Sequence, residues 1–162
     1  MTHNFDHIRP YTDEEVPSVL QDVIHDSFFP MVVNYLYPNA DLTTLQKELS
    51  AIRSVKEFQS KVMHSAIGSV LQKTSTGLSS EGFSLLDNGK RHMFVANHRD
   101  IVLDAAILDV LLYDNGIDTC QITFGDNLMK GDLVVHIGKL NKMFKIVRGG
   151  NIRGRFPPTC VM

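Results

Sequence analysis

Apolar residues recur with a helical period along the first 75 residues, after which short apolar runs alternate with polar turns. In the first part, apolar side chains are spaced three or four apart, which predicts amphipathic helices. The helical stretches are VPSVLQDVIHDSFFPMVVNYLY, DLTTLQKELSAIR and VKEFQSKVMHSAIGSVLQKT. We therefore expect the N-terminal region to consist of helices.

Polar residues at the start of each stretch indicate where these helices begin. The signals are the pairs Thr12 with Glu15 and Ser54 with Glu57, which have the spacing of a capping box, and the N-cap candidate Asp41. Within the first stretch, Pro30 predicts a break or a kink, because proline removes a backbone donor and clashes with the preceding turn.

Beyond Lys90 the pattern predicts alternating strands and helices. HMFVA, TCQITF and MFKIV are short apolar runs of strand type, IVLDAAILDVLLYDNG is helical, and GDNLMKGD reads as a turn with a potential helix. This order predicts a βαβ unit with a parallel sheet. The expected fold class is α/β, with a helical N-terminal region at 1–78 and a partial βαβ domain at 79–162, divided within the polar loop TSTGLSSEG.

A polar cluster follows the first predicted strand. Asn97, His98, Arg99 and Asp100 stand together there, and Asp104 follows in the predicted helix. Strand ends in α/β folds are common places for binding and catalytic groups. A histidine there can act as a general base, and either carboxylate could orient it and stabilise its charged form. The alternative is that Asp100 only caps the helix and Asp104 is a partly buried polar residue.

Basic residues gather toward the C-terminal end, although the net charge is only −2. Between Lys139 and Arg155 there are six Lys and Arg residues and no Asp or Glu. Such a segment indicates an anionic ligand or a solvated basic face. Arg148 is a candidate clamp for a phosphate or carboxylate, because guanidinium pairs with both oxygens of such groups.

Composition argues against a disulfide-rich, metal-binding, secreted or membrane-spanning protein. The 162 residues are 43% apolar, as in an ordinary globular protein, and the two cysteines have no metal-type spacing. We predict neither a disulfide framework nor a metal site. The first residues lack the pattern of a secretion signal, and no apolar run approaches the ~18 residues that span a bilayer. The expected location is the cytoplasm.

Three segments in their order resemble the motif blocks of the glycerolipid acyltransferases, which acylate glycerol phosphate and acylglycerol phosphate. They are FVANHRDIVLD, ITFGDNLM and KMFKIVRGGN. The opening HIRPYTDEEVP also looks like bacterial members that carry a helical extension. The resemblance implies transfer of an acyl group from coenzyme A or acyl carrier protein to a hydroxyl of a small anionic glycerol-type acceptor. This is a step of phospholipid biosynthesis.

The resemblance also implies roles for residues. His98 would be the base and Asp104 its partner, with Asp100 as the alternative; the substrate-binding candidates are Arg148, Lys145, Asn127, Gly125 and Arg99. No metal or prosthetic group is needed, because the acyl thioester is a co-substrate. Peripheral contact with the inner face of the membrane fits lipid acceptors, and no nucleic-acid partner is expected.

Two departures from the family pattern change the expectation. Five residues separate His98 from Asp104, one more than in the family. The family's third block, Phe-Pro-Glu-Gly, is not matched, since Phe156-Pro157 is followed by Pro158-Thr159. We therefore expect a truncated domain. Two alternatives remain: an inactive fragment that binds a membrane surface or acyl carrier protein, and a hydrolase of thioesterase type.

Overall fold

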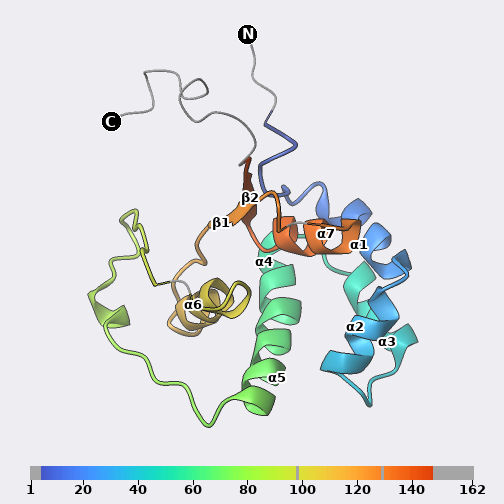
Figure 1. The fold of residues 1–162 in the computed structure, drawn as a ribbon, viewed down its shortest axis with the longest axis horizontal. Helices are drawn as coiled ribbons and strands as arrows, with labels where there is room; N and C mark the ends of the chain where they lie inside the picture. Colours follow the sequence, from blue (N-terminus) through green and yellow to red (C-terminus); the bar gives the residue numbers. More distant parts are fainter. Residues whose placement is uncertain (1–4, 98, 129, 148–162) are drawn as a thin grey trace.

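The computed structural model describes residues 5–97, 99–128 and 130–147, which form a largely helical fold with a small parallel sheet (Figure 1). The helices are α1 (Val16–His25), α2 (Phe29–Leu36), α3 (Leu42–Ser50), α4 (Val55–Phe58), α5 (His64–Thr74), α6 (Leu103–Asp114) and α7 (Asp132–Leu140), joined by the π-helical turn η1 (Gln59–Met63) and the 3-10 turn η2 (Phe83–Leu85); the strands are β1 (Ile122–Gly125) and β2 (Met143–Ile146). The predicted mixture of helix and parallel strand is confirmed.

The helix starts predicted at Asp41 and Ser54 are confirmed, whereas α1 begins at Val16 with Glu15, rather than Thr12, as its N-cap. Asp41 Oδ2 accepts a hydrogen bond from the N–H of Thr44 at 2.8 Å, as an N-cap does. Glu15 reaches back to the N–H of Thr12 at 2.7 Å, but the Thr12 hydroxyl donates to the same carboxylate. The predicted capping box is therefore not formed on α1, and the bond from the Thr12 N–H to Glu15 lies ahead of the helix.

The second capping box is displaced by one residue. Ser54 Oγ accepts from the N–H of Glu57 at 3.1 Å, whereas Glu57 bonds the N–H of Arg53 at 2.8 Å. This cap opens a continuous rod of α4, η1 and α5, which Figure 1 shows as one long helix. The break predicted at Pro30 is also confirmed, because α1 ends at His25 and Pro30 lies in the first turn of α2.

The main core joins the N-terminal helices to α7. Its buried side chains are Val16, Val19, Leu20, Val23, Ile24, Phe29, Leu49, Ile52, Val55, Phe58, Leu133 and Leu140. Leu20, Phe58 and Leu140 are almost completely buried, and each such side chain contributes roughly 1.5–3 kcal/mol of transfer free energy. Because α7 supplies part of this core, residues from both sides of position 78 pack together. The division into 1–78 and 79–162 stays a prediction.

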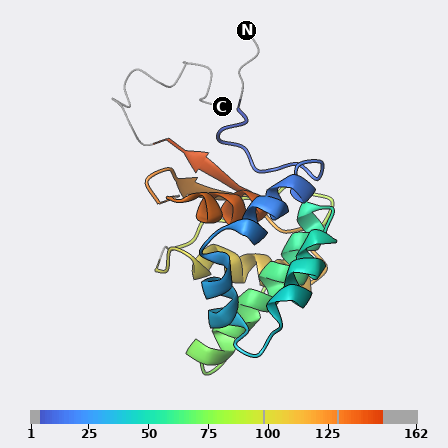
Figure 2. The same cartoon turned by 90° about the vertical axis from the view of Figure 1, so that its right-hand side faces the viewer.

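The sheet is a β1–α7–β2 unit with parallel strands. Ile122 pairs with Met143 and Gly125 pairs with Ile146. Helix α7 connects the strands and packs against both β2 and α1 (Figure 2). The outer side of β2 meets the N-terminal segment, where the N–H of Lys145 donates to the carbonyl of Ile8 at 2.9 Å.

Two expectations for the second half were wrong. The apolar run 92–96 forms no strand, and Met93 and Val95 are 88% and 89% exposed. A strand of a parallel sheet needs cover on both faces. The observed sheet consists of two strands and one connecting helix, and residues 92–96 are not paired with either strand. Their apolar side chains therefore stay exposed. Conversely, α7 was expected only as a connection. The turn expected within 125–132 is present at 126–128, but the helix begins only at Asp132.

The helix predicted at 101–116 is confirmed as α6, which begins two residues later. It ends at the predicted Asn115-Gly116, where Gly116 adopts a φ of +71° that favours glycine. None of the helices in the described ranges has both the length and the apolar character to cross a bilayer.

Candidate functional site

The start of α6 is held by two aspartates whose carboxylates accept hydrogen bonds from nearby backbone N–H groups. Asp104 Oδ2 accepts from the N–H groups of Arg99 at 2.7 Å and of Asp100 at 3.0 Å. Asp100 Oδ1 accepts from the N–H groups of Val102 and Leu103, each at 2.8 Å. Asp100 therefore accepts from the first N–H of α6 and from the residue before it, although the N-cap is Val102 rather than Asp100. Asp104 fixes the two residues that follow position 98.

Two of the predicted site residues, His98 and Arg148, lie outside the described residues. Arg99 and Asp100 are exposed, and Asp104 is half-buried. The structure brings Arg99, Asp100 and Asp104 together, because the carboxylate of Asp104 accepts from the backbone N–H groups of the other two residues.

The remaining predicted residues lie at the carboxyl ends of the two strands. Gly125 is the buried last residue of β1, Asn127 is exposed in the turn after it, and Lys145 is half-buried on β2 beside Phe124. The N–H of Leu128 closes the turn on the carbonyl of Gly125 at 3.0 Å. Parallel pairing places these strand ends at one edge, although no hydrogen bond joins the side chains of Asn127 and Lys145 in the described part of the chain.

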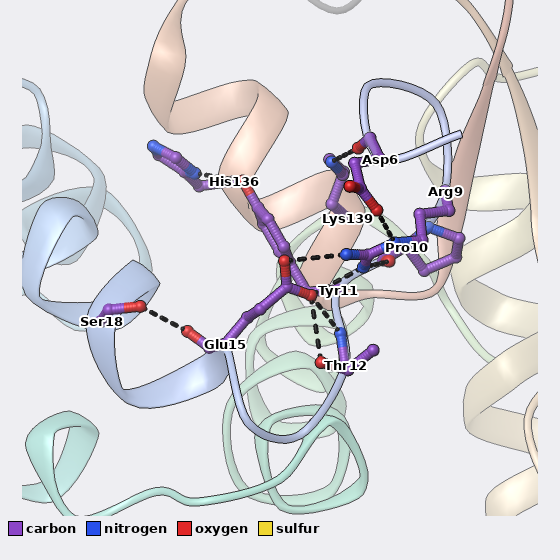
Figure 3. Close-up of polar contacts among 9 residues, drawn as sticks. All are labelled: Asp6, Arg9, Pro10, Tyr11, Thr12, Glu15, Ser18, His136 and Lys139. Atoms are coloured by element: carbon purple, nitrogen blue, oxygen red, sulfur yellow. Dashed lines mark hydrogen bonds and ion pairs between the residues drawn. The ribbon is translucent and has the colours of Figure 1, made fainter. Parts of the chain in front are cut away.

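Next to β2, a polar network ties the N-terminal segment to α7 (Figure 3). Lys139, only 6% exposed, donates from Nζ to the carbonyl of Asp6 at 2.8 Å, with the Tyr11 ring centre 4.5 Å away. Burial lowers the pKa of Lys139, and the nearby Arg9 adds to this. The Tyr11 hydroxyl also contacts His136 Nδ1 at 2.8 Å. Lys139 is thus a structural cation in this conformation.

Arg9 and Glu15 form the ionic part of this network. Their two hydrogen bonds are 2.7 Å and 3.1 Å long, which gives the bidentate geometry of an arginine–carboxylate pair. Bonding to Arg9 lowers the pKa of Glu15 from 4.5 to about 2. In Figure 3 the carboxylate of Glu15 lies between the Arg9 guanidinium and the N–H of Thr12, so one side chain links the segment to the start of α1.

A second polar cluster, which the sequence did not predict, is buried beneath α6. Asp109 is 5% exposed, and its Oδ1 accepts from the N–H of Cys120 at 2.9 Å and from its thiol at 3.2 Å. Burial raises the pKa of Asp109. Burial, together with the charge of Asp109, raises the pKa of Cys120 to about 12. The thiol is therefore a structural donor and a poor nucleophile.

Oxygen Oδ2 of Asp109 has no hydrogen-bond partner within residues 5–97, 99–128 and 130–147. An unsatisfied buried polar group costs about 1–3 kcal/mol, more when it is charged. Such atoms in a folded protein point to strain or to a functional role.

A chain of hydrogen bonds runs beside Asp109. Lys142 Nζ donates to Thr119 Oγ1 at 2.7 Å, Thr119 donates to Gln59 Oε1 at 2.7 Å, and Gln59 donates to Asn141 Oδ1 at 3.2 Å. Lys142 has a left-handed backbone with φ of 58°, which costs a non-glycine residue roughly 1–2 kcal/mol. The bonds of its ammonium group to Thr119 offset this cost.

These residues line a small pocket between η1, α5 and α6. Its walls include Gln59, Asp109, Thr119 and Asn141, and His64 also lines it. His64 Nε2 lies 2.7 Å from Asp114 Oδ1. We had expected His64 to be a surface or core-edge residue, and the half-buried side chain agrees with that interpretation.

A sequence signal for this pocket did exist. Asp109 interrupts an apolar helix and falls on the same face as Ala106 and Leu112, where a charged residue is unusual. Gln59 and Asn141 gave no such signal, because both belong to polar stretches whose burial depends on the packing of distant elements.

The chain matches no protein-family model, no curated protein and no solved structure. Within the described residues, no group of three or more His, Cys, Asp or Glu side chains could hold a metal ion.

Proposed function

We propose that the chain transfers an acyl group from a thioester of coenzyme A or acyl carrier protein to a hydroxyl of a small anionic acceptor, such as glycerol phosphate. His98 is the general base. Asp104 positions the segment that carries it, and Lys145 and Arg148 bind the acceptor's charge. The sequence blocks described above suggest this chemistry.

The observation that carries the proposal is the bond between Asp104 and the backbone after His98. Asp104 Oδ2 binds the N–H groups of residues 99 and 100 and so fixes the chain next to the base. The carboxylate of Asp100 is directed to Val102 and Leu103 at the helix start. This difference supports Asp104, rather than Asp100, as the positioning residue, despite the extra residue in the spacing.

The carboxyl ends of β1 and β2 support the proposed binding of the acceptor's charge. Parallel pairing of β1 and β2 brings Gly125 and Ile146 into register, so the residues after both strands lie at one edge. Ligands in open α/β sheets bind outside the carboxyl ends of strands. Lys145 lies on β2 at this edge, and Arg148 follows two residues after the strand in sequence.

The test is a thiol-release assay with acyl-coenzyme A, with and without glycerol phosphate. We expect acceptor-dependent thiol release that His98→Ala lowers at least ~100-fold, the usual contribution of a general base. Asp104→Asn should lower the rate and shift the pH at which activity falls, whereas Asp100→Asn should leave that pH unchanged. Asp118→Asn is the matched control, since this aspartate is exposed and lies outside the segment 98–104 that carries the proposed base and its partner.

The outcomes separate the alternatives. Release of free fatty acid without an acceptor indicates a hydrolase. Absence of turnover, or equal turnover in His98→Ala, refutes the enzymatic proposal.

A second candidate is membrane-surface binding without catalysis. The exposed apolar side chains of Met93, Val95 and Val102 favour it, because they lie on a segment that also carries Arg91 and Arg99. Apolar and basic side chains together bind anionic lipid surfaces. Co-sedimentation with anionic vesicles, lost in the double variant Met93→Ser/Val95→Ser, would support this role; equal sedimentation of both proteins would refute it.

A further inference from the structure

Strand β1 has a free outer edge. The N–H of Ile122 donates to the carbonyl of Lys142, and the N–H of Asp126 donates to that of Ile146, so alternate backbone groups of β1 point toward β2. The N–H and C=O of Thr123, which lies between them, therefore point away from β2. Within the described ranges the sheet has two strands, and no other segment bonds the backbone of Thr123. Such an unpaired edge can accept a further strand.

The segment 92–96 has the pattern of a strand but lies outside the sheet. Met93 and Val95 are 88% and 89% exposed, and Phe94 between them is 37% exposed. In a strand, Met93 and Val95 would share one face. Removal of these side chains from water would stabilise a docked arrangement. The contact that holds the segment at its start is local, since His92 Nε2 lies 2.9 Å from the carbonyl oxygen of Asp87.

Both sides of this segment are anchored at the ends of α6. Asn88 Nδ2 donates to the carbonyl of Gly116, 3.4 Å away, where the chain leaves α6 toward β1. The backbone N–H groups of Arg99 and Asp100 are bound to Asp104 in the first turn of α6. The chain between these anchors therefore runs opposite to α6, as the first strand of a βαβ unit does.

The chain between the anchors is long enough to move. Helix α6 has 12 residues and is about 18 Å long. The chain from residue 88 to residue 99 can extend over roughly 36 Å. The segment can thus shift sideways onto β1 while both anchors stay in place.

Helix α6 already lies on the face of the sheet that such a unit requires. Ile122 and Met143 are opposite each other on β1 and β2 and lie on one face. Ala105 of α6 and Val135 of α7 both pack against this pair. Successive right-handed crossovers in the same direction across a sheet place their helices on one face. The arrangement of α6 therefore fits the strand order 92–96, β1, β2.

We propose that residues 92–96 dock on the free edge of β1 as a third parallel strand, and that the exposed loop described above is the open state. The occupant of the edge is the chain's own segment, because its two anchors keep it beside α6. Docking brings the residues that follow the segment, His98 among them, to the sheet edge that carries Gly125 and Lys145. This last consequence rests on the proposed acyl transfer, whereas the docking itself does not.

The test is amide hydrogen exchange measured by NMR on the full chain, with and without acyl-coenzyme A. We compare the natural chain with Phe94→Pro/Val95→Pro, in which adjacent prolines remove backbone donors of both orientations. Exchange of the Thr123 amide should be about tenfold or more slower in the natural chain, because docking gives this N–H an acceptor. The Ile122 amide, which is bound to β2, should exchange equally in both proteins and so report an intact sheet.

A matched control carries two prolines in the exposed loop before the segment. Ser79→Pro/Ser80→Pro should keep the slow exchange of Thr123. Exchange of Thr123 that is as fast in the natural chain as in Phe94→Pro/Val95→Pro, with and without acyl-coenzyme A, would overturn the proposal. Protection that increases with protein concentration would also overturn it, because a second copy would then supply the strand. Protection at low concentration without thiol release would support the docking and refute only the acyl transfer.

Discussion

Asp104 and Asp100 each accept a hydrogen bond from the backbone of the other's segment, and together they close the first turn of α6. Asp104 Oδ2 binds the N–H of Asp100 at 3.0 Å, while Asp100 Oδ1 binds the N–H of Leu103 at 2.8 Å. This arrangement is a capping box with one additional residue between its members. The same pair therefore has a structural role that is independent of catalysis.

That role leads to a stability prediction. Asp100→Ala removes the acceptor of two backbone donors at the start of α6, and we expect it to lower the free energy of unfolding by about 1 kcal/mol, the usual effect of losing such an acceptor at a helix start. Urea denaturation monitored by circular dichroism measures this change. Asp100→Asn, which keeps an acceptor oxygen, should recover most of the loss; an Asn variant as unstable as the Ala variant would contradict the capping role.

Lys139 supplies a second prediction. Lys139→Met keeps the apolar stem but removes the bond to the Asp6 carbonyl and the cation over the Tyr11 ring. We expect a loss of about 1 kcal/mol in unfolding free energy, because the Asp6 carbonyl loses its donor and the Tyr11 ring loses its cation. Chemical denaturation checks the value. Lys130→Met, at an exposed position, is the control and should be near neutral.

Proteolysis gives an independent readout of the same change. The network holds the N-terminal segment on α7, so Lys139→Met should speed chymotrypsin cleavage after Tyr11. A variant that is as stable and as protease-resistant as the natural chain would show that Lys139 does not hold this segment.

The pair of Arg9 and Glu15 predicts a pH dependence. The pKa of Glu15 falls from 4.5 to about 2 on folding, so its contribution to stability is complete above pH 4.5 and is lost as the pH falls toward 2. The side chains are about one-third exposed, which limits the contribution at neutral pH to about 1 kcal/mol. Glu15→Gln should remove it.

Denaturation at several pH values tests the sign. The natural chain should exceed Glu15→Gln in stability at pH 7, and the difference should shrink below pH 4.5. A difference that stays constant across this range would mean that hydrogen bonding, rather than the charge, links Glu15 to Arg9.

The reactivity of Cys120 is a further measurable property. Burial and Asp109 raise the pKa of its thiol to about 12, so very little thiolate exists at neutral pH. In a Cys160→Ser background, we expect a thiol reagent to react much more slowly with the folded chain than with the urea-unfolded chain. Asp109→Asn should speed the reaction in the folded state. Equal rates in the folded and unfolded natural chain would contradict this account.

The sequence alone predicted those features that depend on contacts between residues close together in the chain. The helix starts at Asp41 and Ser54 depend on contacts three residues apart, and the end of α6 depends on Gly116, so local rules found them. The apolar run at 92–96 was misjudged because its burial depends on whether a neighbouring strand and a covering layer exist. Helix α7 was missed because the segment between the predicted strands was treated only as a connection.

In the candidate site, too, features set by local contacts were predictable and features set by distant packing were not. The pattern placed Asp100 and Asp104 at a helix start, but it could not distinguish which backbone groups each carboxylate binds. The burial of Asp109 and its contact with Cys120 depend on the return of the chain from α6 to β1, which no local pattern specifies.

The placement of Leu133 and Leu140 in the N-terminal core has a consequence for synthesis of the protein. A chain leaving the ribosome exposes Leu20 and its neighbours long before α7 has been translated, so the nascent helices lack part of their packing surface during that interval. Contacts between such distant residues also slow folding, because a long loop must close first. The early helices therefore lack Leu133 and Leu140 as packing partners until α7 has been translated and docks.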